Sequence, residues 1–357
     1  MPDAVPDPAA AQPVVAPLTT AALILVVTIE PGGESAVREV LPDLAAFARS
    51  LDFRAPNAGL ACVTGFGSDA WDRLFAGPRP ASLHPFQELH GARHHAPATP
   101  GDLLFHIRGE QMDVCYEWAA RLLDRLGGAV TVIDETQGFR YFDHRDLLGF
   151  VDGTENPIGA DARTAALVGS AADPAFAGGS YVIVQKYLHD LASWNTLSTQ
   201  EQERVIGRTK LEDVELPDAV KPHDSHVALN TLTAPDGTAR EILRANMPFG
   251  SFEQGEFGTY FIGYAADPDV TEQMLRNMFL GNPPGTYDRI LDFSTAVTGT
   301  LFYAPSADFF DAPPPAPVLS GTESLSQPAS APVARIAVPA DARDGSLHIG
   351  SLQESAQ

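Results

Sequence analysis

Cysteine and positive charge are both scarce in this chain of 357 residues. Its two cysteines, Cys62 and Cys115, lack metal-ligand spacing, so we expect buried reduced thiols in a reducing compartment. There are 23 Lys and Arg residues against 46 Asp and Glu residues, a formal net charge of −23. Such a surface repels nucleic-acid phosphates and anionic lipids. We therefore expect neither nucleic acid nor a membrane as a partner.

A membrane-spanning run and a basic N-terminal segment are also missing. The apolar run Ala21–Ile29 is much shorter than the roughly 20 residues that a helix needs to cross a bilayer. No Lys or Arg precedes Arg38, so the chain lacks the positive region of a secretory signal. We predict a cytoplasmic protein, with residues 1–20, rich in Ala, Pro and Asp, as a disordered N-terminus.

Apolar periodicity predicts the same order of elements twice, strand-helix-strand-strand-helix-strand. In the first half the expected elements are Ala21–Ile29, Ser35–Ser50, Leu60–Thr64, Asp102–Ile107, Gln111–Leu126 and Ala129–Asp134. In the second they are Tyr181–Tyr187, Leu191–Ile206, Val227–Leu232, Ile242–Arg244, Thr259–Tyr264, Val270–Phe279 and Thr300–Tyr303. This half has three strands, rather than two, between its two helices. The pattern predicts an α+β protein of two ferredoxin-like domains with antiparallel sheets, at residues 21–148 and 149–305.

Beyond Pro305 the composition changes to Ala, Pro and Ser, which predicts a disordered linker at residues 306–343. Residues 344–357 break this pattern, because Gly-Ser-Leu occurs twice between Gly345 and Leu352 and brings apolar side chains with it. A short apolar end on a flexible tether is typical of a docking peptide. An unselected terminal remnant is the alternative.

The run Gly149–Pro157, with sequence Gly-Phe-Val-Asp-Gly-Thr-Glu-Asn-Pro, is the strongest sign of chemistry, and we call it the acid turn. Gly149 and Gly153 allow the backbone to bend closely around a ligand, and the Asn-Pro pair prevents a helix from continuing. Such a turn can hold the carboxylate of Asp152 against a bound molecule. A solvated turn capped by Asp152 or Thr154 is the alternative.

One histidine motif lies in the second half. His226 ends the sequence Lys-Pro-His-Asp-Ser-His, and Arg244 and Asn246 follow eighteen and twenty residues later. A zinc site built on His223 and His226 is disfavoured, because no further ligands are spaced to complete a tetrahedron.

From about Leu23 to Pro305 the sequence resembles the dye-decolourising peroxidases of the bacterial B-type branch. The matching segments are His84–Phe86, Gly101–Ile107, Gly149–Pro157, Tyr181–Leu188, Trp194–Lys210, and Arg244 with Asn246. The resemblance implies two ferredoxin-like halves of the dimeric α+β barrel-like superfamily, with haem b in the second. It also implies His226 as the iron ligand and Asp152, Arg244 and Asn246 on the opposite, distal side.

The implied reaction reduces hydrogen peroxide through a ferryl intermediate and oxidises phenols, dyes or other small aromatic electron donors. Asp152 would move a proton, Arg244 would stabilise negative charge, and Asn246 would orient peroxide. An ordinary aspartate has a pKa near 3.9, so we expect an acidic activity optimum unless burial raises that value.

Further residues are expected around the cofactor. Gly153, Thr154 and Glu155 would contact it from the acid turn, and Arg208 would pair with a haem propionate or form a surface ion pair. Asp288 would accept a hydrogen bond from the iron-bound imidazole, with Asp292 as the alternative.

Residues Gly345–Leu352 resemble the peptide that targets cargo peroxidases to encapsulin. This predicts cargo of an encapsulin nanocompartment in the cytoplasm, and a homo-oligomer, hexameric as is common in this branch.

Three other functions remain open from sequence. A haem- or iron-handling protein of the deferrochelatase kind could use the same fold and His226, but Asp152, Arg244 and Asn246 favour peroxide chemistry. A chlorite-decomposing enzyme is disfavoured by the acid turn, and a pure assembly role by the intact set of site residues.

Overall fold

Two antiparallel sheets, one from each half of the chain, join edge to edge. The computed structural model describes residues 11–318, which form one compact unit. The first half contributes β1 (Ala21–Ile29), β2 (Ala61–Gly67), β5 (Leu103–Gly109) and β6 (Val130–Phe139), in the order β2-β5-β1-β6. This order, with the first strand between the third and the fourth, is that of a ferredoxin-like sheet.

The second half repeats the arrangement and shares the sheet. β7 (Ser180–His189), β10 (Leu243–Arg244), β12 (Glu256–Ala265) and β14 (Thr300–Ala304) lie in the order β10-β12-β7-β14. β11 (Met247–Ser251) also pairs with β12, and β13 (Ser294–Ala296) with β7. β14 pairs with β2 and joins the halves, with Tyr303 opposite Phe66. The predicted α+β class is confirmed, and no pairing among residues 11–318 closes the sheet into a barrel.

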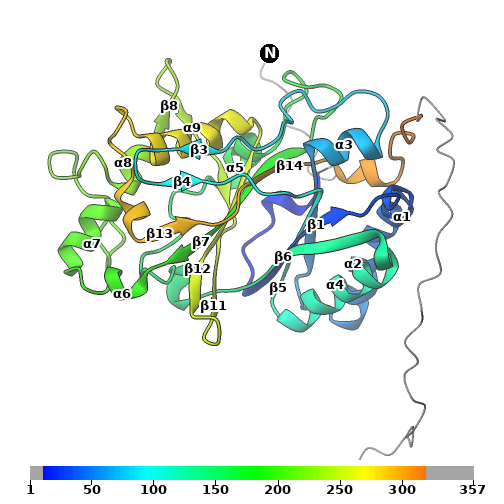
Figure 1. Cartoon of the computed structure of the whole chain (residues 1–357), viewed down its shortest axis with the longest axis horizontal. Helices are drawn as coiled ribbons and strands as arrows, with labels where there is room; N and C mark the ends of the chain where they lie inside the picture. Colours follow the sequence, from blue (N-terminus) through cyan, green and yellow to red (C-terminus); the bar gives the residue numbers. More distant parts are fainter. Residues whose placement is uncertain (1–10, 319–357) are drawn as a thin grey trace, which may run out of the picture. The chain divides into compact units, whose positions relative to one another are not determined.

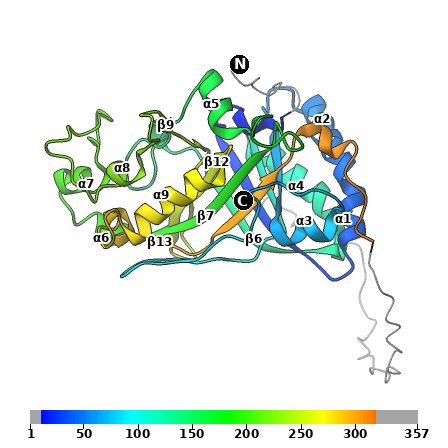
Figure 2. The same cartoon turned by 90° about the horizontal axis from the view of Figure 1, so that it is seen from above.

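Helices flank each half (Figures 1 and 2). The first half carries α1 (Glu34–Val40), α2 (Leu44–Arg54), α3 (Ser68–Leu74) and α4 (Met112–Leu126), and the second carries α5 (Gly159–Ala166), α6 (Leu191–Trp194), α7 (Thr199–Ile206), α8 (His226–Asn230) and α9 (Pro268–Leu280). Two small ribbons, β3 (Leu89–His90) with β4 (His95–Ala96) and β8 (Leu232–Thr233) with β9 (Ala239–Arg240), lie apart from the main sheet.

Strand β1 is buried on both faces, which explains its continuous apolar sequence. Leu23 and Leu25 belong to a core cluster with Trp118 of α4. Ile24 points to the opposite side and belongs to a cluster with Val184 of β7. The halves therefore pack face against face as well as sharing an edge, and the boundary predicted at residue 148 stays a prediction.

Two predicted elements are wrong. The segment expected as the strand Val227–Leu232 is mostly the helix α8, because Ser225 accepts a hydrogen bond from the Ala228 amide at 3.4 Å and starts a helical turn. The helix expected at Leu191–Ile206 is two helices, since Ser198 begins the second by accepting from the Glu201 amide at 3.2 Å.

The segments expected to be disordered are partly ordered. The buried side chain of Gln12 donates to the carbonyl of Thr64 at 2.9 Å and to that of Pro305 at 2.8 Å. Beyond residue 305, Phe310 is buried and stacks on Phe66. The peptide Gly345–Leu352 lies outside the described residues. No helix within residues 11–318 is long and apolar enough to cross a membrane.

Candidate active site

A cavity of about 300 Å³ in the second half brings together residues that are far apart in the sequence. His226, Asp152, Arg244 and Asn246 all line it. Much of the remaining wall is apolar, including Val227, Ile242, Phe261, Met274, Leu275 and Met278. A mostly apolar cavity with a few converging polar groups is typical of a cofactor site.

A buried carboxylate holds His226 at one part of the wall. His226 Nδ1 lies 2.7 Å from Asp288 Oδ2, and Asp288 is fully buried. Asn230, one turn further along α8, donates to the same Asp288 oxygen at 3.3 Å and to the His226 carbonyl at 2.8 Å. Since Asp288 accepts from Nδ1, the other ring nitrogen, Nε2, is the one free to bind a metal.

Asp292, the other candidate partner of His226, contacts the N-terminal half instead. Its Oδ1 atom lies 3.1 Å from His94 Nε2 and accepts from the Tyr287 hydroxyl at 3.1 Å.

The acid turn is fixed from several sides. Gly149 has φ +93°, a backbone conformation that favours glycine, and the Lys210 side chain packs against its Cα atom. The Arg145 guanidinium donates to the Gly149 carbonyl at 2.9 Å. The Asp152 amide donates to the His144 carbonyl at 2.8 Å. These contacts give the Asp152 carboxylate a defined position in the cavity wall.

Asn246 orients that carboxylate. Its Nδ2 atom donates to Asp152 Oδ1 at 3.1 Å, and its Oδ1 atom accepts from the Ile262 amide at 3.1 Å, which fixes the direction of the amide group. Burial raises the pKa of Asp152, while the Asn246 hydrogen bond and the charge of Arg244 oppose the rise. Asp152 is therefore a stronger base than an ordinary aspartate.

Arg244 is held by its backbone and has a largely uncommitted guanidinium. Asn156, the residue before Pro157, accepts from the Arg244 amide at 2.9 Å and donates to the Arg244 carbonyl at 2.8 Å. Within residues 11–318 no carboxylate lies within ion-pair distance of the Arg244 side chain, whose guanidinium contacts Met274 Sδ at 4.0 Å. Its donors can therefore serve a ligand in the cavity.

The sequence does not reveal that Asn156 holds the backbone of Arg244, because an Asn-Pro pair indicates only the end of a helix. The reciprocal pair of hydrogen bonds could not be inferred, because it depends on β10 lying beside the acid turn.

Asp146 is a second carboxyl in the wall that the sequence did not single out. Its Oδ1 atom accepts from the Phe150 amide at 3.0 Å. Burial, together with the nearby charge of Asp152, raises the pKa of Asp146 to about 7. The cavity therefore contains two carboxyls with raised pKa values.

The other residues expected around the cofactor lie at the cavity edge and bind one another. Arg208, nearly buried, donates from Nε to Asp213 Oδ1 at 2.9 Å and forms an ion pair with the more exposed Glu155. Thr154 Oγ1 donates to Asp213 Oδ2 at 2.6 Å. Gly153 has φ +82°. Asp213 thus links these residues, and no sequence signal distinguished it from the other acidic residues.

A second cavity, about 30 Å³ in volume, shares part of this wall. Asp152, Arg244 and Asn246 line both cavities, whereas His226 lines only the larger one. The three polar residues therefore separate the larger cavity from a space that is large enough for about one water molecule.

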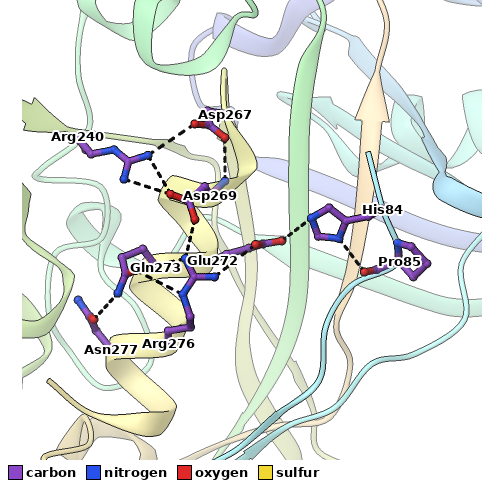
Figure 3. A network of polar contacts seen from close by, with 9 residues as sticks. All are labelled: His84, Pro85, Arg240, Asp267, Asp269, Glu272, Gln273, Arg276 and Asn277. Carbon is purple, nitrogen blue, oxygen red and sulfur yellow. Dashed lines mark hydrogen bonds and ion pairs between the residues drawn. The ribbon is translucent and has the colours of Figure 1, made fainter. Parts of the chain in front are cut away.

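A polar network fixes the helix α9 (Figure 3). Met274 and Met278 of this helix line the cavity. Glu272 lies 3.1 Å from His84 Nε2, and Arg276 pairs with Asp269 at 2.6 Å. Asp269 in turn pairs with Arg240 at 3.3 Å (Figure 3). The network ties α9 to the loop that carries His84 and to the β8–β9 ribbon at the cavity edge.

Comparisons with known proteins agree with this geometry. The family model described as "Dyp-type peroxidase, N-terminal" matches residues 11–140, and "Dyp-type peroxidase, C-terminal" matches residues 143–309. A dye-decolorizing peroxidase from Mycolicibacterium paratuberculosis is 60% identical over 346 residues, which cover 97% of this chain and 93% of that protein.

Solved structures are similar as well. The encapsulated DyP-type peroxidase from Mycobacterium smegmatis has a TM-score of 0.85 and 62% identity, covering 87% of this chain and 100% of that one. A variant of DypB from Rhodococcus jostii in complex with heme has a TM-score of 0.83 and 56% identity, covering 85% of this chain and 98% of that one. The chain belongs to the Dyp-type peroxidase family and is a peroxidase.

Proposed function

We propose that the protein is a haem b peroxidase that reduces hydrogen peroxide and oxidises phenolic, dye-like or other small aromatic electron donors. The observation that carries the proposal is the cavity of about 300 Å³ that brings His226, backed by Asp288, together with Asp152, Arg244 and Asn246. The Rhodococcus jostii relative, a variant of which was solved with heme, supports the choice of cofactor.

The residues present fit haem better than a bare metal ion. A metal ion held by protein alone needs three or four ligands, whereas the iron of haem needs one axial ligand from the protein. His226 Nε2 is one available nitrogen in a largely apolar wall, and the buried Thr271 hydroxyl in that wall has no hydrogen-bond partner within the described part of the chain. The wall therefore suits a large apolar cofactor that also carries polar groups.

Haem, when bound, would supply the iron that exchanges electrons with peroxide and with the donor. Asp152 would take a proton from one peroxide oxygen and return it to the oxygen that leaves as water. The raised pKa of Asp152 matches this task, because its carboxylate accepts a proton more readily, and retains it at higher pH, than the carboxylate of an exposed aspartate.

Arg244 would stabilise the negative charge on the leaving oxygen, since its half-buried guanidinium lines the cavity and has no ion-pair partner within residues 11–318. Asn246 would hold the Asp152 carboxylate in the direction it has here. Arg208, Gly153, Thr154 and Glu155 would contact the cofactor edge from the rim.

The decisive experiment records the visible spectrum of purified protein before and after one equivalent of hydrogen peroxide. The wild type should show a Soret band that changes within the mixing time, and His226→Ala should lose or alter that band. The matched control is His223→Ala, an exposed histidine three residues earlier, which should behave as the wild type. A haem spectrum indifferent to peroxide would instead support haem or iron handling.

We also propose that the protein is cargo of an encapsulin compartment in the cytoplasm and that Gly345–Leu352 binds the shell protein. The encapsulated relative from Mycobacterium smegmatis supports this. Co-expression with a shell protein should load the full chain, and deletion of residues 344–357 should abolish loading. Equal loading of both chains would refute the peptide's role.

A homo-oligomer, hexameric in our proposal, is supported by the edge strand β6. Val132, Ile133 and Phe139 are exposed on it, and unpaired edge strands with apolar side chains favour association. Analytical ultracentrifugation of the full chain should give six chains per particle, and a monomer would contradict the proposal.

A further inference from the structure

A second group of metal-ligand side chains lies on the β3–β4 ribbon, outside the cavity. Glu88 precedes β3, His90 ends it, and His95 begins β4. One ligand atom from each residue lies within 4.8 Å of the others, and this is the one such group found among residues 11–318. None of the three lines the cavity.

The local backbone geometry explains why the three side chains converge. Glu88 lies two residues before His90, and His95 is the direct cross-strand partner of His90, so both imidazoles come close to the Glu88 carboxylate. The two imidazole rings stack in parallel, with centroids 4.4 Å apart and an interplanar angle of 7°. The Nε2 atoms of His90 and His95 lie 2.6 and 2.8 Å from the same Glu88 oxygen.

The opposite face of the ribbon fixes its orientation. Ala96 is fully buried in the core cluster that also contains Leu23, Leu25 and Trp118, and Leu89 packs against that cluster. The ribbon runs beside α9 (Figure 1), and a Cβ atom on Gly91 would lie 2.0 Å from the Phe279 carbonyl oxygen, so the turn rests directly on the helix end. The ligand face is therefore held toward solvent.

The turn between the two histidines is anchored as well. His94 Nε2 lies 3.1 Å from Asp292 Oδ1, and Arg93 donates to the Tyr287 hydroxyl at 2.7 Å. These contacts hold the ribbon to the segment that carries Asp288. Such anchoring reduces the conformational entropy that a ligand would otherwise have to remove on binding.

We propose that Glu88, His90 and His95 form a surface site for a divalent transition-metal ion of the zinc and copper class. Two imidazoles and a carboxylate select this class, whereas Mg²⁺ and Ca²⁺ prefer oxygen ligands. With metal–ligand distances of about 2.1 Å, tetrahedral ligand atoms lie about 3.4 Å apart. The Glu88 oxygen therefore needs to move less than about 1 Å from each nitrogen. Water would complete the coordination.

The test titrates ZnCl₂ into the haem-loaded full chain and follows the heat of binding. We expect one Zn²⁺ per chain at this site, and a loss of affinity of about tenfold or more in His95→Ala and in Glu88→Gln. His223→Ala should bind Zn²⁺ as the wild type does, and excess Mg²⁺ should not compete. Failure of the wild type to bind micromolar Zn²⁺, or unchanged affinity in both ligand variants, would overturn the proposal.

A second measurement identifies the ligands directly. With one equivalent of Cu²⁺, the electron paramagnetic resonance spectrum of the full chain should show nitrogen hyperfine coupling from two imidazoles. The His90→Ala variant should show one fewer nitrogen. A copper signal with no imidazole coupling would refute the site even if copper binds elsewhere.

Discussion

At the residue scale, the positions of Asp152 and Arg244 depend on neighbours that perform no chemistry themselves. Asn246 fixes the carboxylate of Asp152, and Asn156 fixes the backbone of Arg244. Both amides also bind backbone groups, so their two ends have fixed directions. The polar wall of the cavity is therefore preorganised before any ligand enters.

Removal of the Asn156 side chain should loosen Arg244. Asn156→Ala loses two hydrogen bonds to a half-buried backbone, which should cost about 1–3 kcal/mol of unfolding free energy. Asn156→Asp should cost less, because one carboxylate oxygen can still accept from the Arg244 amide. Urea unfolding measures the stability, and stopped-flow mixing with peroxide measures the rate. A normal peroxide rate in Asn156→Ala would show that Arg244 does not need this support.

Asp146 should make the stability of the haem-free protein depend on pH. Its pKa is about 7 when folded and near 4 when unfolded, so between these values the folded state binds more protons. Stability should therefore fall as pH rises from about 4 to 7. The contribution of one such group is at most about 1.4 kcal/mol per pH unit.

Asp146→Asn cannot ionise, so it should flatten this pH dependence. Denaturant unfolding of the haem-free wild type and variant at pH 4.5, 6 and 8 provides the measurement. Asp152 has a raised pKa too, so part of the slope should remain. An identical slope in both proteins would mean that Asp146 is ionised in the folded state across this range.

At the element scale, the helix α8 shows where sequence reasoning succeeded and where it failed. Asp288 was expected as the partner of His226, because a metal-bound imidazole usually donates its other N–H group to a carboxylate, and the two side chains do lie 2.7 Å apart. Asn230 was missed, because the segment was interpreted as a strand. In a helix, residues 226 and 230 share a face, whereas a strand would have left Asn230 far from Asp288.

Strand positions were easier to predict than the connections. The continuous run of β1 and the strands β7, β12 and β14 lie where apolar sequence predicted them, since burial on two faces demands apolar residues throughout. The breaks in the helices depended on single capping residues such as Ser198 and Ser225, whose effect competes with the helical periodicity around them.

A glycine at the end of α7 should influence α8. Gly207 has φ +97°, and a Cβ atom there would lie 3.0 Å from both Ser225 Oγ and Val227 Cβ. Gly207→Ala should therefore cost about 1–3 kcal/mol of backbone strain and also push on the helix that carries His226. We expect lower stability and weaker haem binding.

Gly237→Ala is the matched control, because Gly237 has φ +90° but nothing lies within 4 Å of its added Cβ atom. The Gly237→Ala variant should lose only the unfolding free energy that alanine costs at a positive φ, and it should bind haem normally. Unfolding free energies and haem titrations of both variants separate the two effects. Equal haem affinity in the two variants would show that the contact with α8 does not reach His226.

At the scale of the whole molecule, the two halves should not unfold separately. They share one sheet through the pairing of β14 with β2, and their inner faces share the cluster that contains Ile24 and Val184. The aromatic side chain of Phe66 lies at this junction, stacked with Phe310 from the end of the described chain. Unfolding one half would expose the inner face of the other to water.

A loss of packing at the junction should therefore destabilise both halves equally. Phe66→Ala should cost about 3–5 kcal/mol, as large aromatic truncations in cores do. Trp118 reports on the first half and Trp194 on the second, so variants that retain only one of the three tryptophans follow each half separately. In haem-free protein both probes should shift to the same lower denaturant midpoint. Phe53→Ala, at a side chain 93% exposed on α2, should leave both midpoints nearly unchanged. If Trp118 shifted while Trp194 did not, the halves would be independent domains, and the shared sheet would not couple their folding.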